Sequence, residues 1–268
     1  MKERLDLLLV QKGYYPSREK AKTAIMAGLV YVNKQISDKP GTPTDVEAEI
    51  QVKNNLCPYV GRGGLKLEKA LNEFALDLEG AFCADIGAST GGFTDCMLQR
   101  GARKVYAIDV GYGQLDYKLR TDERVVNMEK TNVRYLEKSA VPEDLDFISI
   151  DVSFISLNLV FPVAVTLLKE NAPLVCLVKP QFEAGREQVG KHGIVKDPAV
   201  HRDVLEKVAF YAVSAGFSPE MLTFSPMTGA KGNIEYLMLL RKKSAGQAAE
   251  PHALPIEETV KAAHGKLL

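Results

Sequence analysis

The strongest constraint on the fold is a regular alternation of helix-like and strand-like segments that begins at residue 65. Apolar residues recur at helical spacing over 65–75 and 198–216. Short apolar runs typical of strands lie at 81–87, 104–110, 124–128, 145–152, 173–179, 221–226 and 234–240. This alternation predicts an α/β fold with a doubly wound, Rossmann-like sheet. The last two runs are close in sequence, so we expect a closing hairpin with an antiparallel final strand.

The first 56 residues follow a different pattern and predict a small α+β domain. Leu5, Leu8 and Leu9 repeat at helical spacing, a second helical stripe follows Ser17, and residues 29–33 alternate like a strand. Residues 1–34 carry seven basic and three acidic side chains in a chain whose formal net charge is zero. A local basic face can bind phosphates even on a neutral protein. A solvent-exposed helix face would explain the same pattern.

Turn-forming residues suggest where the domains meet. Proline and glycine are concentrated just after residue 57. We therefore expect a small domain at 1–56, a linker at 57–61 and a larger domain at 62–243. Residues 244–268 form a tail that we expect to be frayed apart from a terminal helix near Ile256.

Cysteine spacing and hydropathy limit the class of protein. The four cysteines form no C-x-x-C pair and no zinc-like spacing with the four histidines, so we expect reduced thiols and no metal site. The longest apolar stretch, 157–168, is shorter than the ~20 residues that a membrane helix needs. We expect a cytoplasmic protein without a membrane partner, and the sequence leaves its oligomeric state open.

The segment "ADIGASTGGFTD" places a glycine-rich turn between a predicted strand and a predicted helix. Such a turn lets the backbone approach a ligand closely, and an acidic residue ending the next strand can bind ribose hydroxyls. The turn matches neither G-x-G-x-x-G nor the P-loop pattern, which favours S-adenosylmethionine over NAD or a nucleoside triphosphate. A purely structural turn is the alternative. The candidate cofactor residues are Asp85, Gly87, Ser89, Thr90, Gly91, Gly92, Phe93 and Asp109.

Charged residues sit at the ends of the predicted strands. Asp151 and Lys179 each end a strand, and the carboxyl ends of parallel strands meet at one edge of a sheet. Glu235 opens the final strand, which reaches the same edge if it is antiparallel, and Lys66 precedes the first strand. We expect these four side chains to converge, although two unrelated surface salt bridges would explain them too. A partly desolvated lysine beside another cation can act as a general base on a ribose hydroxyl.

Two other methyl-transfer chemistries lack their signatures. The segment "DVSF" at 151–154 has no Asp/Asn-Pro-Pro-aromatic motif of the kind typical of amino-group methylation. Methylation at carbon 5 of a pyrimidine needs a nucleophilic cysteine, but Cys176 lies inside a predicted strand and Cys96 in a predicted helix.

Several motifs together resemble the TlyA family, often labelled haemolysin A, whose catalytic domain is FtsJ-like. They are "GRGGLKLEKAL", "ADIGASTGGFTDC", "IDVSFISL", "LVKPQFE" and "GNIEYL". The N-terminal "RLDLLLVQKG" and "SREKAKTAIMAGLVYVN" resemble the RNA-binding module of ribosomal protein S-four. The resemblance extends through about Arg241. At Thr90 the chain departs from the proline that many FtsJ-like turns carry, which affects the expected contact with the methionine moiety.

The resemblance implies S-adenosylmethionine-dependent 2′-O-methylation of cytidine in ribosomal RNA, within assembled or partly assembled ribosomal subunits. It implies a catalytic tetrad of Lys66, Asp151, Lys179 and Glu235, with Lys179 as the general base. Candidate phosphate contacts in the small domain are Arg4, Arg18, Lys20 and Lys22. The alternatives are a non-catalytic RNA-binding or ribosome assembly factor and a membrane-active haemolysin.

Overall fold

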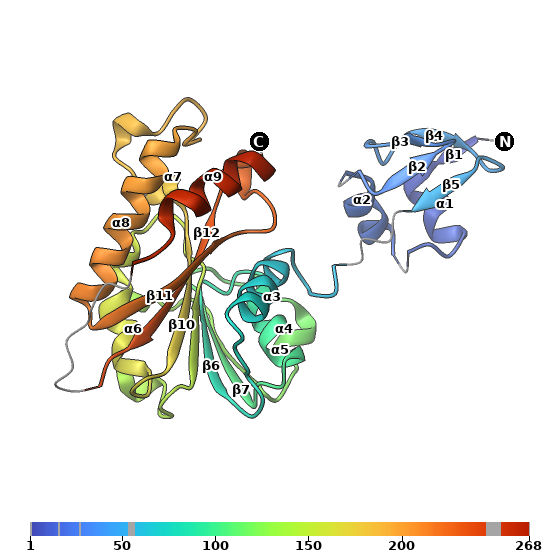
Figure 1. Ribbon diagram of the computed structural model, residues 1–268. Helices are drawn as coiled ribbons and strands as arrows, with labels where there is room; N and C mark the ends of the chain where they lie inside the picture. Colours follow the sequence, from blue (N-terminus) through green and yellow to red (C-terminus); the bar gives the residue numbers. More distant parts are fainter. Residues whose placement is uncertain (1, 16, 27, 53–56, 245–252, 268) are drawn as a thin grey trace. The chain divides into compact units, whose positions relative to one another are not determined.

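The structure is a computed structural model that describes residues 2–15, 17–26, 28–52, 57–244 and 253–267. It divides the chain into two compact units, 1–56 and 57–268 (Figure 1). The domain boundaries expected from the sequence remain a prediction. Residues 57–61, the expected linker, belong to the second unit, where the backbone N–H of Val60 donates a 2.8 Å hydrogen bond to Asp95. Residues 245–252 of the expected tail lie outside the described residues.

The first unit is a small α+β fold. Its elements are β1 (Lys2–Arg4), α1 (Leu5–Gln11), α2 (Arg18–Met26), β2 (Val30–Val32), β3 (Gln35–Ile36), β4 (Pro43–Asp45) and β5 (Ile50–Val52). Strands β1 and β4 pair antiparallel, and β3, β2 and β5 form a second antiparallel sheet. Leu5, Leu9 and Ile25 are fully buried between the two helices and the strands. The helical spacing of these residues is therefore what builds the small core.

The second unit is an open seven-stranded sheet with helices on both faces, which confirms the predicted α/β class. Its helices are α3 (Gly63–Glu73), α4 (Gly92–Gln99), α5 (Tyr117–Arg120), α6 (Phe161–Leu167), α7 (Pro180–Glu183), α8 (Pro198–Ser214) and α9 (Ile256–Leu267). Its strands are β6 (Phe82–Ile86), β7 (Lys104–Ile108), β8 (Val125–Met128), β9 (Phe147–Ile150), β10 (Pro173–Val178), β11 (Phe217–Phe224) and β12 (Tyr236–Lys242).

The strand order β11-β12-β10-β9-β6-β7-β8 brings together strand ends that are far apart in sequence. Strands β10, β9, β6, β7 and β8 are parallel, and β12 runs antiparallel between β10 and β11. The predicted antiparallel final strand is therefore confirmed. In the β10–β12 register Val178 lies opposite Tyr236, so the residues after β10 and before β12 share one edge.

Two apolar layers cover the sheet because side chains alternate along each strand. On one face, Ile148, Ile150 and Cys176 join the layer packed by α6, α8 and α9. On the other, Phe147 and Val175 join the layer packed by α3 and α4. Figure 1 shows the two groups of helices on opposite sides of the strands. Among the described residues, no helix is long and apolar enough to cross a membrane.

Candidate active site

The four charged residues predicted at the sheet edge form two close ion pairs. Nζ of Lys66, on α3, lies 2.5 Å from Oε2 of Glu235, directly before β12. Nζ of Lys179, directly after β10, lies 2.5 Å from Oδ1 of Asp151, directly after β9. The Lys66 and Glu235 side chains are 12% and 3% exposed. The structure thus brings the four residues to one edge of the sheet as two partly desolvated pairs.

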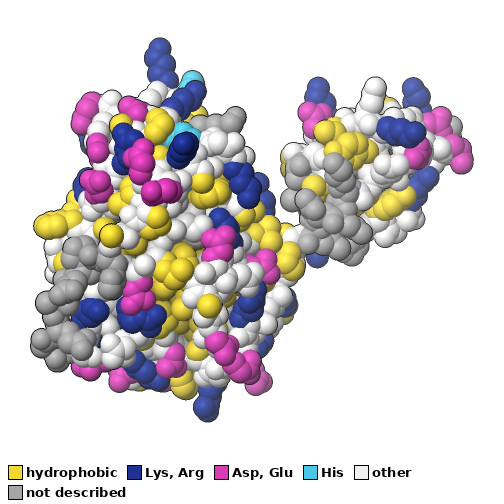
Figure 2. Space-filling view, viewed as in Figure 1, with side chains coloured by type: hydrophobic (Ala, Val, Ile, Leu, Met, Phe, Trp, Pro, Cys, Tyr) yellow, Lys and Arg dark blue, Asp and Glu magenta, His cyan; other side chains and the backbone are white. Residues whose placement is uncertain are grey.

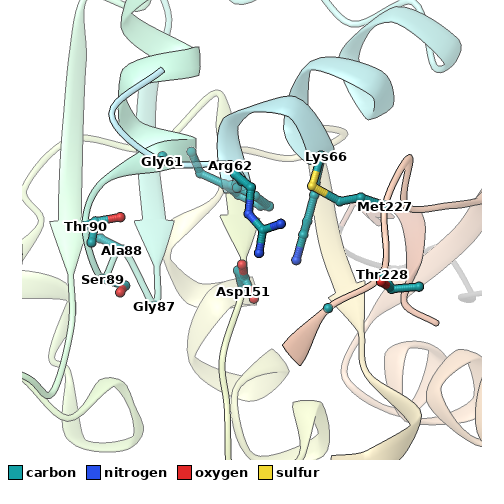
Figure 3. A pocket seen from close by; sticks show the side chains of 14 residues that line it. Gly61, Arg62, Lys66, Gly87, Ala88, Ser89, Thr90, Asp151, Met227 and Thr228 are labelled. Atoms are coloured by element: carbon teal, nitrogen blue, oxygen red, sulfur yellow. The ribbon is translucent and has the colours of Figure 1, made fainter. Parts of the chain in front are cut away.

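A polar cavity of about 220 Å³ lies at this edge and is lined by both Lys66 and Asp151. Figure 3 shows the amine of Lys66, the guanidinium of Arg62 and the carboxylate of Asp151 pointing into a common space. Arg62 immediately precedes α3 and was not singled out from the sequence. The position of Arg62 in "GRGGLK", four residues before Lys66, is the signal that would have identified it.

Two local features hold Lys66 and Glu235 in place. Nζ of Lys69, one helical turn beyond Lys66, donates hydrogen bonds to Phe224 O at 2.5 Å and to Thr223 Oγ1 at 3.1 Å, which ties α3 to the end of β11. A Cβ added at Gly229 would lie 1.9 Å from Glu235 Oε1. Only glycine therefore leaves room for the carboxylate of Glu235.

The glycine-rich turn after β6 is built around Asp85. The carboxylate of Asp85 is fully buried and accepts hydrogen bonds from Thr94 N at 2.9 Å, Thr94 Oγ1 at 2.7 Å and Ser149 Oγ at 3.2 Å. Burial raises the pKa of Asp85 to about 7. Asp85 lines neither of the two cavities beside the turn. Its carboxylate instead holds the N-terminal end of α4 against β9.

The other predicted cofactor residues divide into those that reach a cavity and one that does not. Gly91 has φ +93° and packs against Leu119, where an added Cβ would lie 2.2 Å from Cδ1. The remaining residues of the turn line the smaller cavity, namely Gly87, Ser89, Thr90, Gly92 and Phe93.

A second cavity of about 320 Å³ adjoins the first and shares Gly87, Ser89 and Asp151 with it. Its walls are largely apolar, formed by Ile86, Ile108, Val110, Val133 and Ile155. Asp109 also lines it and accepts backbone hydrogen bonds from Ser89 at 2.8 Å and Gly111 at 2.7 Å. Each carboxylate oxygen retains a further lone pair, so Asp109 can still accept bonds from a ligand hydroxyl.

Two residues of the loop after β9 also belong to this edge. Ser153 Oγ accepts a 3.0 Å hydrogen bond from Nζ of Lys179. Phe154 is 90% exposed, has φ +62° and packs its ring 4.8 Å from that of Phe182. Neither Ser153 nor Phe154 was singled out from the sequence, although both lie in the motif "IDVSFISL". An exposed phenylalanine that lines the larger cavity provides a surface on which a planar base can stack.

In the small unit, two of the four predicted phosphate contacts share one buried acid. Asp6 is fully buried, and its carboxylate accepts hydrogen bonds from Arg4 Nε at 3.0 Å and Arg18 Nε at 2.8 Å. The guanidinium of Arg4 lowers the pKa of Asp6 well below its usual range. Lys22 pairs with Glu19 at 2.7 Å, and Lys20 is exposed. Asp6 thus orients Arg4 and Arg18, which are each about half exposed.

The overall charge distribution does not mark a nucleic-acid surface by itself. Figure 2 shows basic and acidic side chains intermixed on the visible face of each unit. Among the described residues, no group of three or more His, Cys, Asp or Glu side chains is placed to hold a metal ion. Recognition of an anionic polymer would therefore rest on particular groups such as the Arg4–Arg18 pair.

An open α/β sheet with a glycine-rich turn after its first strand, an acid after the second and cavities at their carboxyl ends is typical of enzymes that bind nucleotide-like cofactors, and S-adenosylmethionine-dependent methyltransferases are one such class. The model of the FtsJ-like methyltransferase family matches residues 59–242, and that of the S4 domain matches residues 3–50. The chain therefore belongs to the FtsJ-like methyltransferase family and carries an N-terminal S4 domain, as the sequence motifs predicted.

Three similar proteins span nearly the whole chain. "Putative rRNA methyltransferase YqxC" of Bacillus subtilis is 54% identical over 265 residues, covering 97% of this chain and 92% of the relative. The "16S/23S rRNA (cytidine-2'-O)-methyltransferase TlyA" of Mycobacterium tuberculosis is 43% identical over 242 residues, 90% of each chain. The solved structure "Putative hemolysin from Streptococcus thermophilus" is 50% identical with a TM-score of 0.78, covering 99% of this chain and 96% of the other.

The cofactor of this class, S-adenosylmethionine, fits the residues present. The apolar walls of the larger cavity suit an adenine ring, and the carboxylate of Asp109 at its side suits ribose hydroxyls. Gly87 (φ +90°) lies where the two cavities meet. A Cβ added there would lie 2.4 Å from the carbonyl oxygen of Asp151, so this position has no space for a side chain. The smaller, more polar cavity then suits the amino-acid end of the cofactor.

Proposed function

We propose that this chain methylates the 2′-hydroxyl of a cytidine in ribosomal RNA, with S-adenosylmethionine as the methyl donor. The observation that carries the proposal is the arrangement of Lys179 and Asp151, 2.5 Å apart at the edge of the cofactor cavities, with Lys66 and Glu235 as a second pair. The names of the relatives support the choice of ribosomal RNA and of the 2′-oxygen of cytidine.

In this proposal Lys179 is the general base. A ribose hydroxyl is a poor nucleophile. Removing its proton as the oxygen forms a new bond raises the reaction rate, typically by about 10²–10⁴-fold. The proton passes from the 2′-oxygen to Nζ of Lys179 when that amine is in its neutral form, and Asp151 stabilises the ammonium that results. The bound cofactor supplies an electrophilic methyl group.

Lys66 and Glu235 orient the ribose. Their ion pair is almost fully desolvated, so both side chains are held in one geometry. Arg62, which shares the cavity with Lys66, is suited to contact a phosphate next to the target ribose. The exposed ring of Phe154 supplies a stacking surface for the base.

The S4 domain is the natural candidate for docking on RNA. Arg4 and Arg18 present planar guanidinium groups that match phosphate geometry, and Lys20 adds exposed positive charge. Lys22, half-buried and paired with Glu19, is the fourth candidate contact. We further propose that the substrate is a ribosomal subunit, assembled or partly assembled, and that the reaction takes place in the cytoplasm where such subunits are formed.

Methyl transfer from tritiated S-adenosylmethionine to ribosomal subunits and to deproteinised ribosomal RNA tests the proposal. We expect label in RNA, and recovery of 2′-O-methylcytidine after nuclease digestion and mass spectrometry. Lys179→Met is the matched inactive control. Subunits labelled better than free RNA would support the assembled substrate. A wild-type protein that binds ribosomal RNA without transferring label would instead favour the non-catalytic assembly factor.

A further inference from the structure

We propose that Ser153 is a positioning residue that orients the amine of Lys179. The inference rests on the proposed function, in which Lys179 takes the proton from the 2′-hydroxyl. Ser153 is two residues beyond Asp151, in the loop that follows β9, and lines the larger cavity. It contacts Lys179 and would act through it, without touching the methyl group.

Lys179 has two different partners, one that balances its charge and one that forms a directed hydrogen bond. Oδ1 of Asp151 is 2.5 Å from Nζ of Lys179, yet this buried oxygen has no hydrogen-bond partner with acceptable angles among the described residues. Ser153 Oγ, at 3.0 Å, meets both the distance and the angle of a hydrogen bond from the same amine. Asp151 therefore supplies the counter-charge, and Ser153 supplies the directed bond.

The residue after Ser153 holds the loop in a fixed conformation beside Lys179. Phe154 has φ +62°, a left-handed conformation that is unfavourable for a residue other than glycine. The ring of Phe154 packs 4.8 Å from that of Phe182, on the short helix α7 that begins directly after Lys179. The loop after β9 therefore contacts the segment around Lys179 on both sides of the Lys179–Ser153 bond, through the Asp151–Lys179 pair and through the two phenylalanine rings. Such local strain persists only where surrounding contacts hold it.

The geometry of nitrogen explains what the bond contributes. A neutral amine carries two N–H groups and one lone pair in a tetrahedral arrangement around Nζ. The Lys179 amine rotates about its Cε–Nζ bond unless one N–H is fixed. Donating an N–H to Ser153 restricts this rotation and confines the lone pair to the two remaining tetrahedral positions, which favours a productive orientation when the base accepts a proton.

The test compares Ser153→Ala with Ser153→Thr, which keeps the hydroxyl. We expect Ser153→Ala to lower kcat about tenfold, the rate equivalent of losing one hydrogen bond, with KM for ribosomal RNA unchanged. We expect Ser153→Thr to stay within about threefold of the wild type. Ser156→Ala is the matched control, because Ser156 belongs to the same loop but bonds Glu183 and not Lys179.

Each outcome decides between alternatives. A Ser153→Ala variant with wild-type kcat overturns the inference, as does an equal loss of kcat in Ser153→Ala and Ser156→Ala, or in Ser153→Ala and Ser153→Thr. These results would leave the proposed function intact as long as the wild type is active and Lys179→Met is not. If the wild type produces no 2′-O-methylcytidine, the proposed function itself fails, and Ser153 loses its role with it.

Discussion

Nζ of Lys66 and Oε2 of Glu235 lie 2.5 Å apart although the two residues are separated by 169 positions in the chain. The contact joins the first helix of the methyltransferase unit to the start of β12, which runs antiparallel to its neighbours β10 and β11. Both side chains are nearly buried, so each depends on the other for compensation of its charge.

Removing one member of the Lys66–Glu235 pair should cost more stability than removing both. We expect Lys66→Met to lower the free energy of unfolding by about 3 kcal/mol, because it leaves the carboxylate of Glu235 buried without a partner. The double variant Lys66→Met/Glu235→Gln should recover much of that stability and remain inactive. Urea denaturation and methyl transfer measure the two quantities. Additive losses of stability in the double variant would contradict the coupling.

Lys179→Arg should abolish activity and preserve the fold. Arginine retains the positive charge beside Asp151 but does not lose its proton at physiological pH, so it cannot act as a base. We expect kcat to fall at least 100-fold, with a melting temperature close to that of the wild type. Lys169→Arg, a surface lysine paired with Asp146, is the control and should remain active. Appreciable methyl transfer by Lys179→Arg would exclude Lys179 as the base.

Gly87→Ala should damage the site more than Gly80→Ala, although both glycines have positive φ values, +90° and +70°. Added Cβ atoms would lie 2.4 Å from the carbonyl oxygen of Asp151 at Gly87 and within 4 Å of no atom at Gly80. Gly80→Ala should therefore cost only the conformational strain, roughly 1 kcal/mol. Gly87→Ala should also weaken cofactor binding, measured by calorimetry with S-adenosylhomocysteine. Equal affinities in the two variants would refute the role assigned to the close contact.

The S4 domain should lose stability in acid because of Asp6. The hydrogen bond from Arg4 lowers the pKa of Asp6 in the folded state, so the folded form binds fewer protons than the unfolded form. The contribution of Asp6 is complete above its unfolded pKa of about 4 and declines as the pH falls below that value. Asp6→Asn should flatten the dependence of the domain's stability on pH in this range. The measurement is the loss of the amide signals of residues 2–52 in the full chain as the pH falls. A variant whose acid unfolding matches the wild type would disprove the assignment.

The contact between α8 and α9 should weaken in mild acid. Nδ1 of His201 lies 2.7 Å from the hydroxyl of Tyr236 and 3.2 Å from Nε2 of His264. Burial lowers the pKa of both histidines, and nearby Asp197 opposes this shift. The folded state favours the neutral imidazole rings. The contribution of the two histidines to stability should therefore be complete above about pH 6.5 and should decline as the pH drops below that value. His264→Phe should reduce the pH dependence of the melting temperature, and an unchanged dependence would count against the cluster.

Much of the fold was predictable because its signals are local. The strand-like runs and the glycine-rich turn at 84–95 lie where the structure has β6 to β12 and the start of α4. The strand β1 was not predicted, because three residues pairing with Pro43–Asp45 leave no periodic pattern. The convergence of Asp151, Lys179 and Glu235 was predictable as well, since it follows from the positions of strand ends and from the direction of one strand.

The details of the site were less predictable because they depend on where each side chain points. Asp85 was expected to face the cofactor, but its carboxylate turns inward to Thr94 and Ser149. Arg4 and Arg18 were predicted as phosphate contacts, but their shared bond to Asp6 was not predicted. Ser153 and Lys69 were not identified at all, because a single hydroxyl or amine has no sequence pattern that marks its partner.

The sequence by itself determined the α/β class, the two-part organisation and the set of charged residues able to meet at the sheet edge, because periodicity and turn chemistry act over a few neighbouring residues. Only the tertiary structure decided which lysine pairs with which carboxylate, which acid is buried, and that Ser153 bonds the amine of Lys179. These outcomes depend on desolvation and on hydrogen-bond direction, and both are set by atoms that come from distant parts of the chain.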